Sequence, residues 1–324
     1  MFTARRTRYA AATVAVSALA LSVAACSSDD DASGSGKSGS SGDKTVSIAL
    51  PPAGWDEGTA ASYVIKKILT EQGYDVKTQS ADLGIIFTGL AGGSYDIYAD
   101  TWLPTTHAAY MKKYGDKLED LGTWYDSAKL TIAVNEDSPA QSIEDLKKDA
   151  KDYDNKLVGI EAGAGETGVV KNDMLPGYGL DDLNFQTSST SAMLASLKSA
   201  EQSGKNIAVT LWRPHWAYTQ FKIRDLEDPK GLMGDAEQIH AYAHKGFAAD
   251  HPDVAKWMKN FKLTDDQIGE IENLMRNDDR FTNDPEGAVD AWLEKNPDFV
   301  PGVLGDAATS GATKTSGATK TSGS

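Results

Sequence analysis

Strand-like and helix-like segments alternate between residues 45 and 211, and this alternation restricts the possible folds more than any other feature of the chain. Short runs of apolar or alternating residues predict strands at 45–50, 74–77, 96–99, 129–134, 156–160 and 206–211. Stripes of apolar residues at helical spacing predict helices at 58–72, 83–90, 168–174 and 191–203. The alternation predicts an α/β protein with largely parallel sheets.

After about residue 245 the pattern changes to helices alone. Thr264 and Gln267 form a capping box, and Asp284-Pro285 supplies a cap and a first-turn proline for the next helix. These C-terminal helices need an apolar surface to cover, so we expect them to return to the first half of the chain. We predict two lobes, lobe I from residues 46–131 plus 236–304 and lobe II from residues 132–235, with a ligand in the cleft between them.

Both ends of the chain differ from this body. Three arginines precede an apolar, Ala-rich run that ends in small residues directly before Cys26, the only cysteine. We interpret residues 1–25 as a lipoprotein signal peptide and Cys26 as the lipidated residue, with an ordinary secretory signal as the alternative. Residues 26–44 read as a flexible Gly/Ser/Asp tether, and residues 305–324, with a GATKTS repeat, as a disordered tail. We therefore expect a lipid-anchored protein on the outer face of the cytoplasmic membrane.

The chain is acidic, with 32 Lys and Arg against 47 Asp and Glu and a net charge of −15. Binding to nucleic acid rests on clustered cations, so this charge argues against such a partner. His240 and His244 stand four residues apart in a predicted strand without a third ligand nearby. We predict no metal, no cofactor and, because no nucleophile motif is present, no enzymatic activity.

Three glycines at Gly163-x-Gly165-x-x-Gly168 follow a predicted strand and precede a helix, which is the spacing of a dinucleotide-binding fingerprint. The acidic residue that this fingerprint expects about 20 residues later has no clean counterpart. Glu166 would also place negative charge beside a pyrophosphate. A less specific interpretation is that the glycines expose backbone N–H groups at the helix N-terminus, which could hold a small carboxylate. A dinucleotide-dependent exported enzyme remains the alternative.

Tryptophan is unusually prominent, and four of the seven lie on predicted strand-to-helix connections, where a cleft would be: Trp55, Trp102, Trp212 and Trp216. Trp257 and Trp292 fall within helical apolar stripes, and we expect them in the core. Converging indole rings form an apolar box with electron-rich faces, which suits a quaternary ammonium held by cation–π attraction. His107, near a predicted helix start, is either a structural hydrogen-bonding residue or a contact for the ligand.

Several of these segments form a recognisable set: Gly54-Trp55-Asp56, Trp102-Leu103-Pro104-Thr105-Thr106-His107, the loop 159–165 (GIEAGAG), Trp212-x-Pro214-His215-Trp216, and residues 228–230 followed by 236–240. Together they resemble the glycine betaine-binding proteins of ABC uptake transporters, and the resemblance covers about residues 45–300. It implies a two-lobed, periplasmic-binding-protein-like (type II) fold that closes around its ligand and delivers it to a permease. We expect the protein to be a monomer.

In that family, tryptophans form a cage for the trimethylammonium group, and a histidine with backbone N–H groups holds the carboxylate. The resemblance assigns the cage to Trp55, Trp102 and Trp212, and the carboxylate clamp to His107, Gly165 and Glu166. The first two cage residues and the histidine would come from lobe I, and the others from lobe II. A charged His107 would make binding weaken as the pH rises through its pKa.

Three residues bear on which ligand is bound. The position of Glu166 is often apolar in the family: its side chain can turn outward, but facing the cleft it would repel a carboxylate. Arg213, after Trp212, is a second departure. Glu57 stands where choline-binding relatives carry an acid, although those relatives generally lack the histidine found here. Glycine betaine or a related quaternary-ammonium osmoprotectant is therefore expected, with choline, proline betaine and ectoine as alternatives. A sensor that signals to a receptor could use the same cleft.

Overall fold

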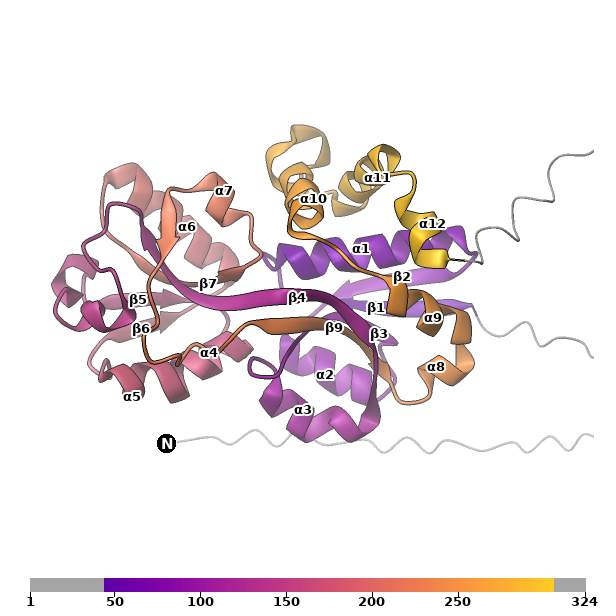
Figure 1. The fold of residues 1–324 in the computed structure, drawn as a ribbon, viewed down its shortest axis with the longest axis horizontal. Helices are drawn as coiled ribbons and strands as arrows, with labels where there is room; N and C mark the ends of the chain where they lie inside the picture. The colour runs from indigo at the N-terminus through magenta and orange to yellow at the C-terminus, as the bar shows by residue number, and fades with distance from the viewer. Residues whose placement is uncertain (1–43, 306–324) are drawn as a thin grey trace, which may run out of the picture. The chain divides into compact units, whose positions relative to one another are not determined.

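The computed structural model describes residues 44–305 (Figure 1). The predicted signal peptide, Cys26 and nearly all of the predicted tether and tail lie outside the described residues. Within the described part of the chain, no helix combines the length and the apolar character that crossing a membrane requires.

The first half of the fold is a sheet in the order β2-β1-β3-β9-β4. Its strands are β1 (Thr45–Leu50), β2 (Asp75–Ser80), β3 (Ile97–Leu103), β9 (Glu237–His244) and the beginning of β4 (Leu118–Asn135). Helices α1 (Asp56–Glu71) and α2 (Leu83–Ala91) connect the first three strands, which pair in parallel. We call this part lobe I. The predicted strand–helix order therefore holds here.

The second half continues from β4 in the order β4-β7-β5-β6, with β8 also paired to β4. Its elements are β5 (Lys156–Gly159), α4 (Gly165–Val169), α5 (Leu175–Tyr178), β6 (Asn184–Thr187), α6 (Thr190–Ser203), β7 (Ala208–Arg213), α7 (Ala217–Gln220) and β8 (Ile223–Asp225). A π-helical turn, Val170–Met174, joins α4 to α5. We call this part lobe II.

The chain after β9 is helical, as predicted. It forms α8 (Phe247–Asp250), α9 (Pro252–Asn260), α10 (Asp265–Asn277), α11 (Pro285–Lys295) and α12 (Phe299–Leu304). Both predicted caps are present, the capping box of Thr264 with Gln267 and the Asp284 carboxylate that accepts from the Gly287 N–H. Helices α10 and α11 pack against α1 and so return to lobe I, as Figure 1 shows. Trp257 and Trp292 are buried in the core.

Strand β4 differs most from the sequence-based expectation. It is 18 residues long, whereas only 129–134 was predicted as a strand. The part before Lys129 pairs with β9, and the register shifts three times between Asp120 and Ala128. These irregularities break the two-residue alternation on which strand prediction depends. The pairing changes from β9 to β7 between Ala128 and Lys129, so one strand joins the two halves (Figure 1).

The prediction of largely parallel sheets was wrong. Strands β1, β2 and β3, and likewise β5, β6 and β7, pair in parallel, but every pairing made by β4 and β9 is antiparallel. The physical reason is topological: β4 and β9 carry the chain between the lobes in opposite directions, instead of returning through a crossover helix.

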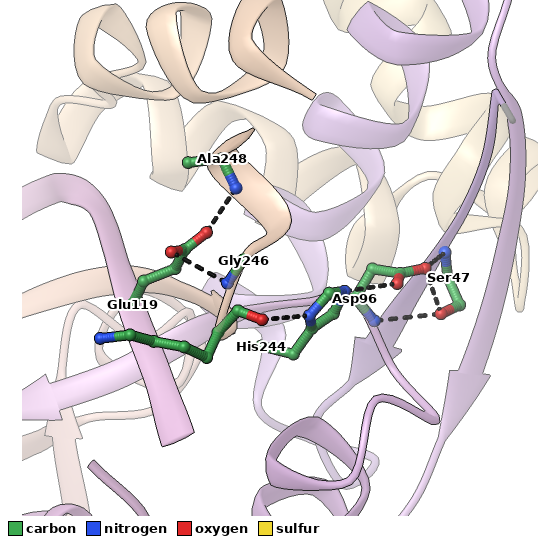
Figure 2. A network of polar contacts seen from close by, with 7 residues as sticks. Ser47, Asp96, Glu119, His244, Gly246 and Ala248 are labelled. Carbon is green, nitrogen blue, oxygen red and sulfur yellow. Dashed lines mark hydrogen bonds and ion pairs between the residues drawn. The ribbon is translucent and has the colours of Figure 1, made fainter. Parts of the chain in front are cut away.

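A polar network fixes lobe I at the end where β1 and β3 begin (Figure 2). The Asp96 carboxylate accepts from the Ser47 N–H at 2.6 Å and from the Ser47 hydroxyl at 2.7 Å, and it pairs with His244 Nε2 at 3.2 Å. The Glu119 carboxylate accepts from the backbone N–H groups of Gly246 and Ala248. The network ties β1, β3, β4 and β9 together and leaves their opposite end free to carry a site.

Candidate functional site

A small cavity lies where lobe I faces lobe II. Its wall contains all six residues that the sequence analysis assigned to a ligand site, together with others from both lobes: Trp55, Glu57, Trp102, Thr106, His107, Leu130, Ile160, Ala164, Gly165, Glu166 and Trp212.

The strand topology explains why residues so distant in sequence meet. Trp55 follows β1, and Trp102 lies near the end of β3. Gly165 follows β5, and Trp212 lies near the end of β7. The carboxyl ends of parallel strands lie at one edge of a sheet, which is where α/β proteins bind ligands. The two lobes present these edges to each other.

The three predicted cage tryptophans are nearly buried and come from both lobes. The rings of Trp55 and Trp212 meet edge to face, with centroids 6.0 Å apart and an interplanar angle of 66°. Trp55 Nε1 donates to Thr190 Oγ1 at 3.0 Å, and Trp102 Nε1 donates to Asp100 Oδ1 at 2.7 Å. The indole N–H of Trp212 lies beside the Glu57 carboxyl group and lowers the pKa of that group. Two of the rings are thus held by their N–H edges.

Contacts between the lobes close the cavity. The Glu161 carboxylate of lobe II accepts from Trp55 Nε1 at 3.3 Å and from the Thr190 N–H at 2.8 Å. The Tyr110 hydroxyl of lobe I donates to the Gly163 carbonyl oxygen at 2.8 Å. Glu161 and Thr190 were not singled out by the sequence analysis, although Glu161 lies inside the GIEAGAG loop.

His107 is buried between Trp102 and the cavity. Its Nδ1 accepts a hydrogen bond from the Trp102 backbone N–H at 2.9 Å, so the proton of the neutral ring lies on Nε2. Burial lowers the pKa of His107 to about 3. The ring is therefore neutral near neutral pH, because burial disfavours its charged form, and the pH dependence that a charged His107 would cause is not expected. Nε2 is buried without a partner in the described part of the chain. It remains available as a neutral donor.

Gly165 begins α4, and there is no room for a larger residue. A Cβ at this position would overlap the carbonyl oxygen of Thr106, which belongs to lobe I. The backbones of the two lobes therefore approach each other closely at this glycine. The first N–H groups of a helix have no acceptor within the helix, so those of Gly165 and Glu166 can serve a ligand.

The Glu166 side chain does not turn outward. The residue is 2% exposed, and its carboxyl group lies in the cavity wall beside the backbone of Thr131 and Leu211. No well-formed hydrogen bond reaches either carboxyl oxygen among the described residues, although the nearby backbone groups of Thr131 and Leu211 lower the pKa of the carboxyl group. Burial raises the pKa of Glu166 well above its ordinary value.

A second buried carboxyl group, that of Glu57, lines the lobe I side. Burial raises its pKa well above the ordinary value, and the negative charges of Asp100 and Glu272 raise it further. Burial also raises the pKa of Asp100 to about 7, against the lowering effect of the hydrogen bond from Trp102. The sequence analysis noted Glu57 but not Asp100, which no motif distinguishes from the many surface acids.

Two residues of the Trp212 motif, Arg213 and Trp216, do not belong to the cavity wall. The Arg213 guanidinium pairs with Asp225 at 3.0 Å and lies over the Tyr218 ring at 3.5 Å. Trp216 is half-buried beside His215 and Arg276 and does not line the cavity, so its predicted place in the cleft was wrong. It packs against His215 and Phe221, where the chain turns into α7.

The two histidines of β9 pair with different carboxylates, His240 with Asp120 at 2.9 Å and His244 with Asp96 at 3.2 Å. Within residues 44–305, no group of three His, Cys, Asp or Glu is arranged to hold a metal ion.

Comparison with known proteins identifies the family. Residues 44–295 match the substrate binding domain of ABC-type glycine betaine transport systems. A glycine betaine/carnitine transport binding protein of Listeria monocytogenes is 39% identical over 159 residues, or 48% of this chain. The match spans 51% of that relative, about half of its length.

Solved structures resemble the whole body. A lactococcal protein, crystallised in its closed, liganded conformation with glycine betaine, is 30% identical and has a TM-score of 0.75 over 81% of this chain and 100% of its own. An ABC-transporter choline binding protein in complex with choline is 26% identical, with a TM-score of 0.74 over 81% of this chain and 92% of its own. These likenesses confirm the predicted two-lobed, type II fold. The family match covers more than half of the sequence, and the chain belongs to the family of substrate-binding domains of ABC-type glycine betaine transport systems.

Proposed function

We propose that the protein binds glycine betaine, or a closely related quaternary-ammonium osmoprotectant, outside the cytoplasm and delivers it to the permease of an ABC importer. It would act as a binding protein and not as an enzyme, without a cofactor, and as a monomer. The observation that carries this proposal is one small cavity in which three tryptophans meet an unpartnered, neutral histidine donor.

The tryptophans support a cage for the cationic end of the ligand. A quaternary ammonium has no N–H to donate, so it is held by apolar contact and by cation–π attraction of about 0.5–2 kcal/mol per ring. Trp55, Trp102 and Trp212 reach the cavity from both lobes, so a ligand that touches all three favours the closed state.

The other end of the cavity supports a carboxylate clamp. His107 offers Nε2–H, and the start of α4 offers the N–H groups of Gly165 and Glu166. All three belong to the cavity wall. Glycine betaine carries a carboxylate a few bonds from its ammonium group, so one small molecule could use both halves of the site.

Choline is the second candidate, and the buried Glu57 is the observation that favours it. A carboxyl group in the cage wall could accept a hydrogen bond from the hydroxyl group of choline. Calorimetric titration of residues 44–305 with glycine betaine, proline betaine, choline and ectoine tests the proposal. Quenching of Trp fluorescence is an independent measure of closure. A response to a dinucleotide but to none of these ligands would overturn the proposed function.

Replacing His107 distinguishes the two ligands. His107→Asn removes the Nε2 donor but keeps an atom that can accept the Trp102 N–H. Hydrogen bonds to charged groups contribute about 1.5–3 kcal/mol, so glycine betaine affinity should fall by about 10- to 150-fold. Choline affinity should barely change. His107→Gln, which restores a donor near the Nε2 position, should recover part of the loss. An equal effect on both ligands would mean that His107 only supports Trp102.

We also propose that a lipid on Cys26 anchors the protein to the membrane. The full-length chain should appear in the membrane fraction of bacterial cells and incorporate labelled fatty acid, whereas Cys26→Ser should do neither. If the Cys26→Ser protein stays in the membrane fraction, residues 1–25 or another segment must anchor it instead.

A further inference from the structure

Glu166 is the one feature of the cavity that the proposed function leaves without a role for its side chain. The residue belongs to the wall and is almost fully buried, and among residues 44–305 only the backbone groups of Thr131 and Leu211 approach its carboxyl group, without forming a well-formed hydrogen bond. The position opens α4 and adjoins Gly165, at the end of the cavity that holds the backbone donors. A buried polar group without a partner costs stability, so a ligand that satisfies it gains binding free energy.

We propose that Glu166 determines specificity: in the closed cavity it carries a proton and donates its O–H to the carboxylate of the ligand. This proposal rests on the proposed function and refines it, since it assigns the site to ligands with a carboxylate in preference to simple cations such as choline.

The charges around the cavity support the protonated form. Among the described residues, no lysine or arginine belongs to the wall, so no side chain of residues 44–305 there can neutralise an ionised Glu166. The other titratable groups of the wall are Glu57 on α1, which is a second acid, and His107, which is neutral. The strands packed against Glu166, β4 and β7, present the backbone of Thr131 and Leu211 and the side chains of Leu130 and Trp212. Burial raises the pKa of the Glu166 carboxyl in these surroundings.

The proton also changes what Glu166 does to a ligand. An ionised carboxyl group would repel the carboxylate of glycine betaine, whereas a protonated one is a donor to it. A glutamate in water has a pKa of about 4.3 and is ionised near neutral pH. A cleft open to water would therefore hold Glu166 ionised, and closure around a betaine would take up one proton from the solvent. Affinity then falls as the pH rises, by up to about tenfold per pH unit between the pKa values of the open and closed states.

Isothermal titration of the full body with glycine betaine, from pH 5.5 to 8.5 and in buffers of different ionisation enthalpy, measures both the affinity and the protons taken up. We expect Glu166→Gln, which has the same shape and donates from its amide without titrating, to take up one proton fewer than the wild type. Its affinity should also vary less with pH. Glu57→Gln is the matched change on the lobe I side of the cavity. In this variant, the part of the pH dependence of affinity that comes from Glu166 should remain.

Three outcomes would decide against the proposal. Equal proton uptake and equal pH slopes in wild type and Glu166→Gln would overturn it. So would choline binding that strengthens as the pH rises and is lost in Glu166→Gln, because Glu166 would then act as an anion that holds the cation. A change in melting temperature without a change in proton uptake would reduce Glu166 to a structural residue. No binding of glycine betaine by any variant at any pH would instead contradict the proposed function itself.

Discussion

Replacing Trp212 by alanine is expected to weaken glycine betaine binding by about 30- to 700-fold. The loss combines one cation–π face, about 0.5–2 kcal/mol, with the apolar contact of a large ring, for a total of about 2–4 kcal/mol. Trp212 donates no well-formed hydrogen bond in the described residues, but its indole N–H lies beside the buried Glu57 carboxyl group, so the change also alters the surroundings of that group. Trp55→Ala would also remove the hydrogen bonds to Thr190 and Glu161.

Trp257→Ala is the matched control, because Trp257 is buried in α9 and does not line the cavity. It should lower the melting temperature while changing the affinity little. Trp212→Phe keeps an aromatic face and should bind more tightly than Trp212→Ala. If Trp216→Ala abolishes binding and Trp212→Ala does not, the wrong ring of the motif has been assigned to the cage.

Gly165→Val is expected to reduce the affinity for glycine betaine at least as strongly as Trp212→Ala does, by about 100-fold or more. Even a Cβ at this position would overlap the Thr106 carbonyl oxygen across the cleft, and that oxygen belongs to the backbone and cannot swing aside. Overpacking of this kind costs about 3 kcal/mol or more where the neighbours cannot yield. The lobes would have to stay apart, so the contacts from lobe I and lobe II could not form together.

Gly168→Val provides the comparison within the same helix. It adds the same β-branched side chain, but the nearest atom to a Cβ there is Asn172 Nδ2, at 4.0 Å. Calorimetry should show near-normal affinity for Gly168→Val and a large loss for Gly165→Val, and small-angle scattering should show an open form of the latter at saturating ligand. Equal affinities would mean that closure does not bring Gly165 against Thr106 in solution.

The site residues could be predicted because residue type and position in a motif identified them. Trp55, Trp102 and Trp212 lie in short segments next to strands, and the α/β alternation places the ends of those strands at a common edge. The motif at Trp212 also held a second ring, and the sequence could not say which one faces the cavity. That choice depends on where α7 begins, which only the fold determines.

Protonation states could not be read from the sequence. Among 47 acidic residues, nothing in composition or spacing separates Glu57, Asp100 and Glu166 from acids on the surface, because their pKa values follow from burial by residues far away in the chain. His107 is similar: its neutral form depends on a backbone N–H of Trp102 and on the surrounding aromatic side chains. Strand β4 was predicted only over residues 129–134, because the irregular register of its earlier part hides the two-residue alternation there.

The continuity of β4 restricts how the protein can release its cargo. A flexible linker between the lobes would allow them to rotate about many axes, but here a single strand belongs to both sheets, and β9 pairs with it up to the point where its partner changes to β7. Opening therefore requires these strands to bend, and the natural place is the stretch of shifted register before Lys129, where fewer ladder bonds resist deformation. We therefore expect the lobes to open about one axis, set by the point in β4 where the two sheets meet.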